Sequence, residues 1–174
     1  MFYKTNISDA FLIENSVYDD ARGSFYEIMN SEINTNINTK DPSQIYISIS
    51  KRGVLRGAHY QINTPQSKLI TCVKGSVIDF AVDLRKESPT FRNVIQYELN
   101  EQNKHSVFLP QGLAHGFLSL SEGSSIVYQI RGAYKPENER GVNFNSLGLD
   151  LPFSPTIIND RDNSWPFLDD CEVF

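Results

Sequence analysis

The sequence has little cysteine and no long apolar run, and each absence excludes a class of protein. Its two cysteines, Cys72 and Cys171, lie far apart in the chain and form no CxxC pair. We therefore expect neither a disulfide scaffold nor a structural zinc site, and we interpret Cys72 as a small buried residue. No stretch of about 18 apolar residues is present, so no membrane span is expected. The first residues lack the apolar segment of a signal peptide, which makes the cytoplasm the expected compartment.

Positive charge is also in the minority. The chain has 16 lysines and arginines against 21 acidic residues, a formal net charge of −5. Nucleic-acid binding relies on clustered positive charge, so no nucleic-acid partner is predicted. A chain of 174 residues with 40% hydrophobic content can bury a substantial core, and we predict one domain over residues 1–174.

Helical periodicity is almost absent, and short segments with strand-like patterns take its place. Residues 44–50 are the clearest case, because Ile45, Ile47 and Ile49 fall on one face and predict a half-buried strand. Strands are predicted at 10–13, 44–50, 54–61, 68–73, 77–84, 94–99, 106–109, 113–120 and 125–130, and residues 19–24 are a turn-rich stretch that leads into 25–28. Short helices are predicted within 30–43 and near 160–164, the latter in a C-terminal stretch that wraps the outside. Many short strands separated by turns are typical of an all-β, antiparallel jelly roll.

Residues 54–61 concentrate polar side chains on one apolar strand. Counting by twos from Gly57 puts His59 and Gln61 on the same face, which is typical of a strand that lines a binding cleft. The same count puts Arg56 on the other face. If Arg56 and His59 both contact a ligand, the strand needs a bulge or an end near Gly57.

The chain has three histidines, and two of them fall within predicted strands. His59 and His115 could meet on the inner face of a barrel, whereas His105 follows a turn and is interpreted as a surface residue. A metal site would need a second histidine close to His59 in the sequence and a carboxylate ligand nearby. The segment 59–61 offers neither, and the cationic Lys68 would repel a metal ion, so no metal ligands are predicted.

Several polar residues are instead typical of proton transfer. His59 suits a general base, Tyr128 could donate a proton, and Lys68 could stabilise an oxyanion. Tyr128 could equally be a core residue and Lys68 a solubilising charge, so composition alone does not decide. The carboxylates that could orient the imidazole are Asp79, Asp83, Asp160 and Asp162.

Seven collinear motifs resemble the dTDP-4-dehydrorhamnose 3,5-epimerase family. The central motif, Arg56-Gly57-Ala58-His59-Tyr60-Gln61, is similar to the family's Arg-Gly-Leu-His-aromatic-Gln signature. The other motifs are residues 20–27, 68–75, 82–91, 112–117, Tyr128 with 134–136, and 160–162. The resemblance implies a double-stranded β-helix (cupin-like), no cofactor, and a homodimer in which residues 1–30 add to the partner's sheet.

The resemblance also implies a reaction and a set of site residues. A base removes a proton beside the C4 ketone of a dTDP-linked 4-keto-6-deoxyhexose, and an acid returns a proton on the opposite face of the enolate. His59 is then the base, Asp162 its orienting partner (with Asp83 the alternative), Tyr128 the acid and Lys68 an enolate stabiliser. The implied substrate-binding residues are Arg22, Phe25, Glu27, Gln44, Arg56, Gln61, His115, Tyr134 and Arg161. Phe25 or Glu27 would serve the partner's site.

Departures from the family pattern leave the regiochemistry open. Ala58 replaces the usual Leu and is expected to empty space behind the base; Tyr46 replaces Asn, Leu151 lies where a Trp is common, and Trp165 replaces a small residue. Epimerisation at C3, at C5 or at both is compatible with these changes, for deoxysugar or lipopolysaccharide O-antigen synthesis. The alternatives are a 4-keto sugar 3,4-ketoisomerase and a non-catalytic sugar-nucleotide binding module on the same fold.

Overall fold

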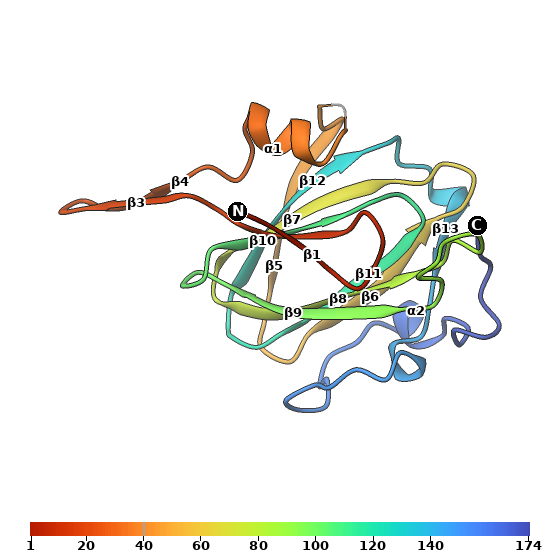
Figure 1. Ribbon diagram of the computed structural model, residues 1–174. Helices are drawn as coiled ribbons and strands as arrows, with labels where there is room; N and C mark the ends of the chain where they lie inside the picture. Colours follow the sequence, from red (N-terminus) through yellow and green to blue (C-terminus); the bar gives the residue numbers. More distant parts are fainter. Residues whose placement is uncertain (40) are drawn as a thin grey trace.

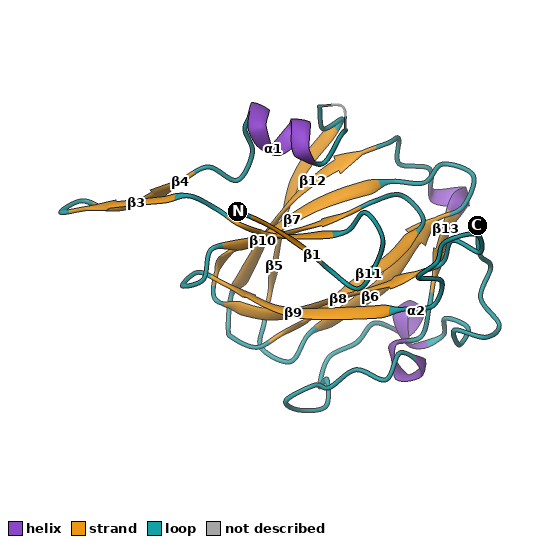
Figure 2. Ribbon diagram, in the orientation of Figure 1, coloured by secondary structure: helices purple, strands orange, loops and turns teal. Residues whose placement is uncertain are grey.

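The computed structural model describes residues 1–39 and 41–174 (Figure 1). Within these residues, β-strands dominate and short helices lie at the periphery (Figure 2). The strands are β1 (Phe2–Lys4), β2 (Phe11–Glu14), β3 (Val17–Asp20), β4 (Gly23–Tyr26), β5 (Gln44–Ser50), β6 (Leu55–Gln61), β7 (Ser67–Lys74), β8 (Ser76–Asp83), β9 (Val94–Asn100), β10 (His105–Leu109), β11 (Leu113–Ser119), β12 (Ser124–Arg131) and β13 (Glu139–Gly141). The helices are α1 (Ser31–Asn36) and α2 (Asp160–Asn163), with 3-10 turns η1 (Pro136–Asn138) and η2 (Phe144–Ser146). None of the described helices has the length and apolar character needed to cross a membrane.

Two antiparallel sheets enclose the main core. The six-stranded sheet has the order β1-β2-β10-β7-β12-β5, and the five-stranded sheet has the order β13-β6-β11-β8-β9. Ile70, Phe117 and Ile126 are each at most 1% exposed in the cluster that the two sheets share. Sheets with such non-consecutive neighbours form a jelly roll, which confirms the all-β prediction.

The predicted strands from residue 44 onwards all occur, with ends that shift by one residue at most. The prediction for His105 is wrong. His105 is not a surface turn residue, because it opens β10 and is half-buried against the sheet. The turn-rich stretch at residues 19–24 forms the centre of the β3–β4 hairpin, whose turn lies at residues 21–22. The helix predicted within 30–43 is α1; residue 40 of that range lies outside the described residues.

β5 shows the predicted alternation, but its apolar face is the outer one. Ile45, Ile47 and Ile49 are each more than 60% exposed, on the last strand of the six-stranded sheet. The alternate residues, including Tyr46 and Ser48, point into the molecule and line a pocket. The alternating pattern therefore assigned residues to the two faces of this strand correctly, but the prediction that the apolar face is buried was wrong.

The C-terminal segment, residues 143–174, covers the outer face of the five-stranded sheet and creates a second apolar cluster. Phe153, Leu168 and Phe174 pack there against the buried Leu55 and Ala58. This confirms the prediction of a C-terminal wrap. Ala58 is 0% exposed in this cluster and does not line the pocket, so its small side chain adjusts the packing of the wrap and does not open space beside His59.

A bulge in β6 brings Arg56 and His59 to the same face. His59 pairs with His115 of β11 and Arg56 pairs with Phe117, so β6 uses one more residue than β11 over this interval. The extra residue lies next to Gly57, which has a φ of +114°. A Cβ on Gly57 would approach the Cα of Gly116 to 2.5 Å and the carbonyl oxygen of His115 to 2.6 Å. Gly57 thus allows the close strand contact that the bulge requires.

Gly57→Ala is therefore expected to destabilise the protein by about 3 kcal/mol, because the methyl group would collide with backbone and φ would be strained. Urea unfolding measures this change. Gly123→Ala is the matched control, since Gly123 also has a positive φ, +71°, but a Cβ there meets nothing within 4 Å. The control should lose about 1 kcal/mol. Equal losses in the two variants would show that the close contact at Gly57 does not matter.

Candidate active site

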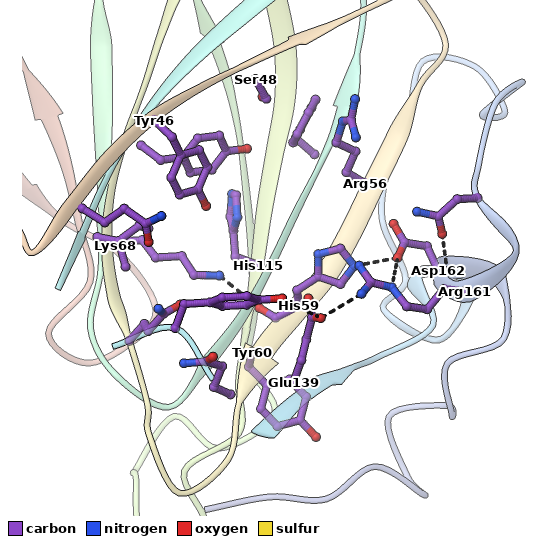
Figure 3. A pocket seen from close by; sticks show the side chains of 18 residues that line it. Tyr46, Ser48, Arg56, His59, Tyr60, Lys68, His115, Glu139, Arg161 and Asp162 are labelled. Atoms are coloured by element: carbon purple, nitrogen blue, oxygen red, sulfur yellow. Dashed lines mark hydrogen bonds and ion pairs between the residues drawn. The ribbon is translucent and has the colours of Figure 1, made fainter. Parts of the chain in front are cut away.

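A cavity of about 380 Å³ lies between the two sheets and is closed at one side by α2 (Figure 3). Most of the side chains that line it form three groups from different parts of the fold, and Gln66 and Tyr134 come from loops. The six-stranded sheet contributes Gln44, Tyr46, Ser48, Lys68, Tyr128 and Ile130; the five-stranded sheet contributes Arg56, His59, Tyr60, Gln61, His115, Phe117 and Glu139; and Asn159, Arg161 and Asp162 come from α2 and its N-cap.

His59 and Asp162 form a close pair at the α2 side of the cavity. His59 Nε2 lies 2.6 Å from Asp162 Oδ1, and the other carboxylate oxygen accepts a hydrogen bond of 3.0 Å from the amide of Gly57. Asn159 caps α2 and accepts a hydrogen bond from the Asp162 amide, which fixes the start of the helix. Burial would raise the pKa of Asp162, but the hydrogen bond and charge attraction from His59 outweigh it and lower the pKa.

This pairing separates the two carboxylates that the sequence left as alternatives. Asp162 is the partner of His59, whereas Asp83 binds Arg85, Ser88 and Thr90. An imidazole held by a buried carboxylate has a fixed orientation and tautomer, which suits it to accept a proton from a ligand.

His115 and Lys68 extend the polar surface beyond His59. His115 lies opposite His59 across the β6–β11 pair, and its Nε2 is 2.8 Å from Asp79 Oδ2. Burial lowers the pKa of His115, opposed by Asp79. Lys68 Nζ donates to the carbonyl oxygen of His59 at 3.1 Å. Burial also lowers the pKa of Lys68, to about 8, against the attraction of Asp79 and Glu139.

The lowered pKa of Lys68 predicts an alkaline limit to activity. A neutral amine cannot stabilise a negative oxygen, so kcat/KM should fall as the pH rises through about 8. Lys68→Arg should abolish this decline while lowering the plateau, because a guanidinium stays charged but has a different shape. The pH profile of kcat/KM measures both effects. A decline that persists unchanged in Lys68→Arg would assign it to another group.

Tyr128 and Tyr46 stack on each other in the opposite sheet. They are directly opposed in the β5–β12 pair, with ring centroids 4.9 Å apart and planes inclined by 22°. Tyr128 is 6% exposed, and burial, together with the charge of Asp79, holds its pKa well above the ordinary value. The phenol therefore stays protonated at neutral pH and is able to donate a proton.

Polar residues at the cavity mouth hold one another in place. Arg161 Nη1 donates to Glu139 Oε2 at 2.7 Å, and the Tyr134 hydroxyl lies 3.4 Å from the same oxygen. Gln61 uses its amide on the neighbouring loops, since Nε2 donates to the carbonyls of Thr64 and Ala133 and Oε1 accepts from the amide of Lys135. Gln61 thus anchors the loop that carries Tyr134.

Ten of the predicted site residues line this cavity: His59, Tyr128, Asp162, Lys68, Gln44, Arg56, Gln61, His115, Tyr134 and Arg161. The other three do not. Arg22, Phe25 and Glu27 belong to the β3–β4 hairpin and the segment after it, which projects away from the barrel (Figure 1). The Arg22 side chain is 90% exposed and pairs with Asp20 of the same hairpin.

Several lining residues were absent from the sequence-based site, although part of the signal was present. Tyr46 and Ser48 alternate with Gln44 on β5, so extending the period-two count from Gln44 would have included them. Glu139 and Asn159 give no such signal, because they come from a three-residue strand and a helix cap. Among the described residues, no cluster of three or more His, Cys, Asp and Glu side chains could hold a metal ion.

The chain resembles known proteins in sequence and in structure. A family model described as dTDP-4-dehydrorhamnose 3,5-epimerase matches residues 4–170. The curated dTDP-4-dehydrorhamnose 3,5-epimerase of Methanothermobacter thermautotrophicus is 37% identical, over 99% of this chain and 97% of that protein. The crystal structure of the Sulfolobus tokodaii enzyme of the same name superposes with a TM-score of 0.92 at 38% identity, covering 100% of this chain and 98% of that one. A 3,5-epimerase from Legionella pneumophila, solved in complex with dTDP-4-keto-L-rhamnose, gives a TM-score of 0.93 at 33% identity over 99% of this chain and 94% of that one.

Proposed function

Because the chain belongs to the dTDP-4-dehydrorhamnose 3,5-epimerase family and is an epimerase of deoxysugar biosynthesis, we propose that it inverts a dTDP-linked 4-keto-6-deoxyhexose at C3 and C5. The observation that carries this proposal is the arrangement of titratable groups in one cavity. The His59–Asp162 pair lies on the five-stranded side, and the protonated phenol of Tyr128 lies on the six-stranded side. Epimerisation needs a base and an acid on opposite faces of a sugar ring, and groups on two facing sheets meet that requirement.

In the proposed mechanism His59 removes the proton from the carbon next to the C4 ketone. Asp162 holds the imidazole and stabilises its protonated form. The electron pair of the broken C–H bond moves onto the C4 oxygen, and the Lys68 ammonium and His115 stabilise the resulting enolate. The Tyr128 hydroxyl then protonates the carbon from the other face, which inverts the configuration.

The remaining lining residues suit the nucleotide part of the substrate. Arg56 and Arg161 present guanidinium groups that match diphosphate oxygens. Gln44 and Tyr134 would contact the sugar or the base, and Gln61 would act by fixing the Tyr134 loop. In this proposal Arg161 exchanges part of its contact with Glu139 for the substrate.

We also propose a homodimer formed through β5 and the β3–β4 hairpin. Both carry exposed apolar side chains, among them Ile47 at 61%, Tyr18 at 63% and Phe25 at 63% exposure. An edge strand with an apolar outer face invites pairing with a second copy. Arg22, Phe25 and Glu27 would then reach the partner's cavity. Light scattering should give twice the mass of one chain, and a monomer would contradict the dimer.

Incubation with dTDP-4-keto-6-deoxyglucose in deuterated water tests the reaction. We expect NMR to show deuterium at C3 and C5 and inversion at both carbons. Label at one carbon would identify a mono-epimerase, and a carbonyl displaced to C3 would identify a ketoisomerase. Binding of dTDP without incorporation of deuterium into the sugar would reject catalysis on this substrate and would support a non-catalytic binding module.

A further inference from the structure

Trp165, the sole tryptophan of the chain, lies directly behind the His59–Asp162 pair. Its indole meets the imidazole of His59 edge-on, with ring centroids 6.3 Å apart and planes inclined by 72°. Trp165 is not among the residues that line the cavity. It therefore contacts the base from the side that faces away from a bound ligand.

A glycine provides the space in which the indole lies. Gly141 of β13 is paired with His59 of β6. A Cβ on Gly141 would lie 2.4 Å from Cε2 and Nε1 of Trp165 and 2.5 Å from Cδ1. The pyrrole edge of the indole thus packs on the backbone of β13 at Gly141, the residue that pairs with His59. Any larger residue at position 141 would push the indole out of this place.

The indole also faces the carboxylate of the pair. Trp165 Nε1 is buried and forms no hydrogen bond of ordinary geometry with the described residues. Burial raises the pKa of Asp162 and His59 lowers it, and these are the two main effects. The N–H of Trp165 also helps to lower the pKa of Asp162. A buried N–H without a partner is costly, and its effect on Asp162 indicates that the two groups lie close together without forming a hydrogen bond.

The backbone around Trp165 is tied to the strand that ends at Gly141. The amide of Asn143 donates to the carbonyl of Pro166 at 2.8 Å, and Asn143 Nδ2 donates to the carbonyl of Asn163 at 3.0 Å. These two hydrogen bonds hold the segment 163–166 on both sides of Trp165. The indole is therefore fixed relative to β13 and α2, the two elements between which it lies.

We propose that Trp165, seated on Gly141, is a positioning residue that holds the imidazole of His59 and the carboxylate of Asp162 in their reactive geometry and keeps water from the back of the pair. This inference rests on the proposed role of His59 as the base. The geometry of a base matters because a displacement of about 1 Å can lower the rate about 100-fold. Exclusion of water also strengthens the attraction between imidazolium and carboxylate.

The charged and titratable groups around the imidazole come from every neighbouring element. They are Asp162 and Arg161 of α2, Lys68 of β7, His115 of β11, Glu139 of β13 and Arg56 of β6. Trp165 is an uncharged neighbour on this side, so its removal changes packing and hydration without removing a charge.

The first test uses the emission of Trp165 in the full-length enzyme without substrate. A protonated imidazole in contact with an indole quenches its fluorescence, so the wild-type emission should show a step towards weaker emission on the acidic side of a pH scan. His59→Asn should lose this step, and His105→Asn, a change far from Trp165 in the fold, should retain it. A wild-type emission with no His59-dependent step would overturn the contact.

The second test is a double-mutant cycle on activity and on urea unfolding. Trp165→Ala should lower kcat about 10- to 100-fold with little change in KM. It should also move the acidic limb of the kcat/KM profile to lower pH, because water would weaken the attraction between the imidazolium and the carboxylate. Gly141→Ala should reproduce these effects by displacing the indole. In the Trp165→Ala background, Gly141→Ala should cost little more, since the added methyl group then has room.

Further variants separate positioning from general stability. Trp165→Phe, which keeps a ring but lacks the N–H, should retain an intermediate kcat. Phe167→Ala removes a 55% exposed side chain two residues away and should behave as wild type. Additive effects of Trp165→Ala and Gly141→Ala, or a loss of stability with kcat and the acidic limb unchanged, would overturn the proposal. A wild-type enzyme that exchanges no deuterium would refute the proposed function instead, while the fluorescence step and the unfolding cycle would still test the contact.

Discussion

His59→Ala is expected to abolish deuterium incorporation at both C3 and C5. Only one imidazole in the cavity is paired with an α2 carboxylate, and its removal leaves no group of comparable basicity in that place. General-base catalysis typically contributes 10²–10⁴-fold, so exchange should fall by about that factor or below detection. Proton NMR of the substrate in deuterated water measures both carbons in the same experiment.

Two companion variants protect this prediction against a folding artefact. His59→Asn keeps a polar side chain near Asp162 and should be equally inactive while unfolding at a urea concentration close to that of wild type. His105→Ala, on β10 and outside the cavity, should exchange normally. Exchange that survives at one carbon in His59→Ala would mean that a second base serves that carbon, and His115 would become the candidate.

Tyr128→Phe is expected to separate proton removal from inversion. The variant loses the hydroxyl but keeps the ring, so the stack on Tyr46 persists. His59 and Lys68 remain in place, and deuterium should still enter from the face of the base. Inversion should fall about 100-fold, because the raised pKa of Tyr128 is what keeps a proton available on the other face. The ratio of exchange to inversion, measured by NMR, is the diagnostic quantity.

Tyr97→Phe supplies the matched control for this change. Tyr97 packs on the main core from β9 and lies outside the cavity, so its hydroxyl should be dispensable for both exchange and inversion. An equal loss of exchange and inversion in Tyr128→Phe would argue that the phenol binds the substrate and does not act as the acid.

The sequence was sufficient to predict the strands β5 to β12 and the polar row on β6, because both depend on local periodicity. Its limits appear where chain segments distant in sequence meet. Asp162 reaches His59 across 103 positions, by way of a four-residue helix in the C-terminal wrap. Nothing local distinguishes Asp162 from Asp83, which binds Arg85 two residues further along the chain. The family resemblance favoured Asp162, and the packing of α2 on the barrel supplies the physical reason.

Two other discrepancies have specific physical causes. Arg56 faces the cavity because the bulge at Gly57 shifts the alternation of β6 by one residue, and a bulge depends on the partner strand as well as on the sequence. Ala58 lies under the C-terminal wrap because the outer face of the five-stranded sheet is buried. The prediction of empty space behind the base assumed that Ala58 faces the cavity. Ala58 instead faces the apolar layer between the five-stranded sheet and the C-terminal wrap.

The C-terminal wrap divides the proposed catalytic pair between two layers of the molecule. His59 belongs to the barrel, whereas Asp162 and Trp165 arrive with a segment that docks on its outside. Segments of this kind can open at a lower free energy than the barrel beneath them. Each local opening would withdraw the carboxylate from the imidazole while the barrel stays folded. In the proposed mechanism, activity therefore depends on the docking of the last thirty or so residues, and opening of this segment would stop catalysis without unfolding the barrel.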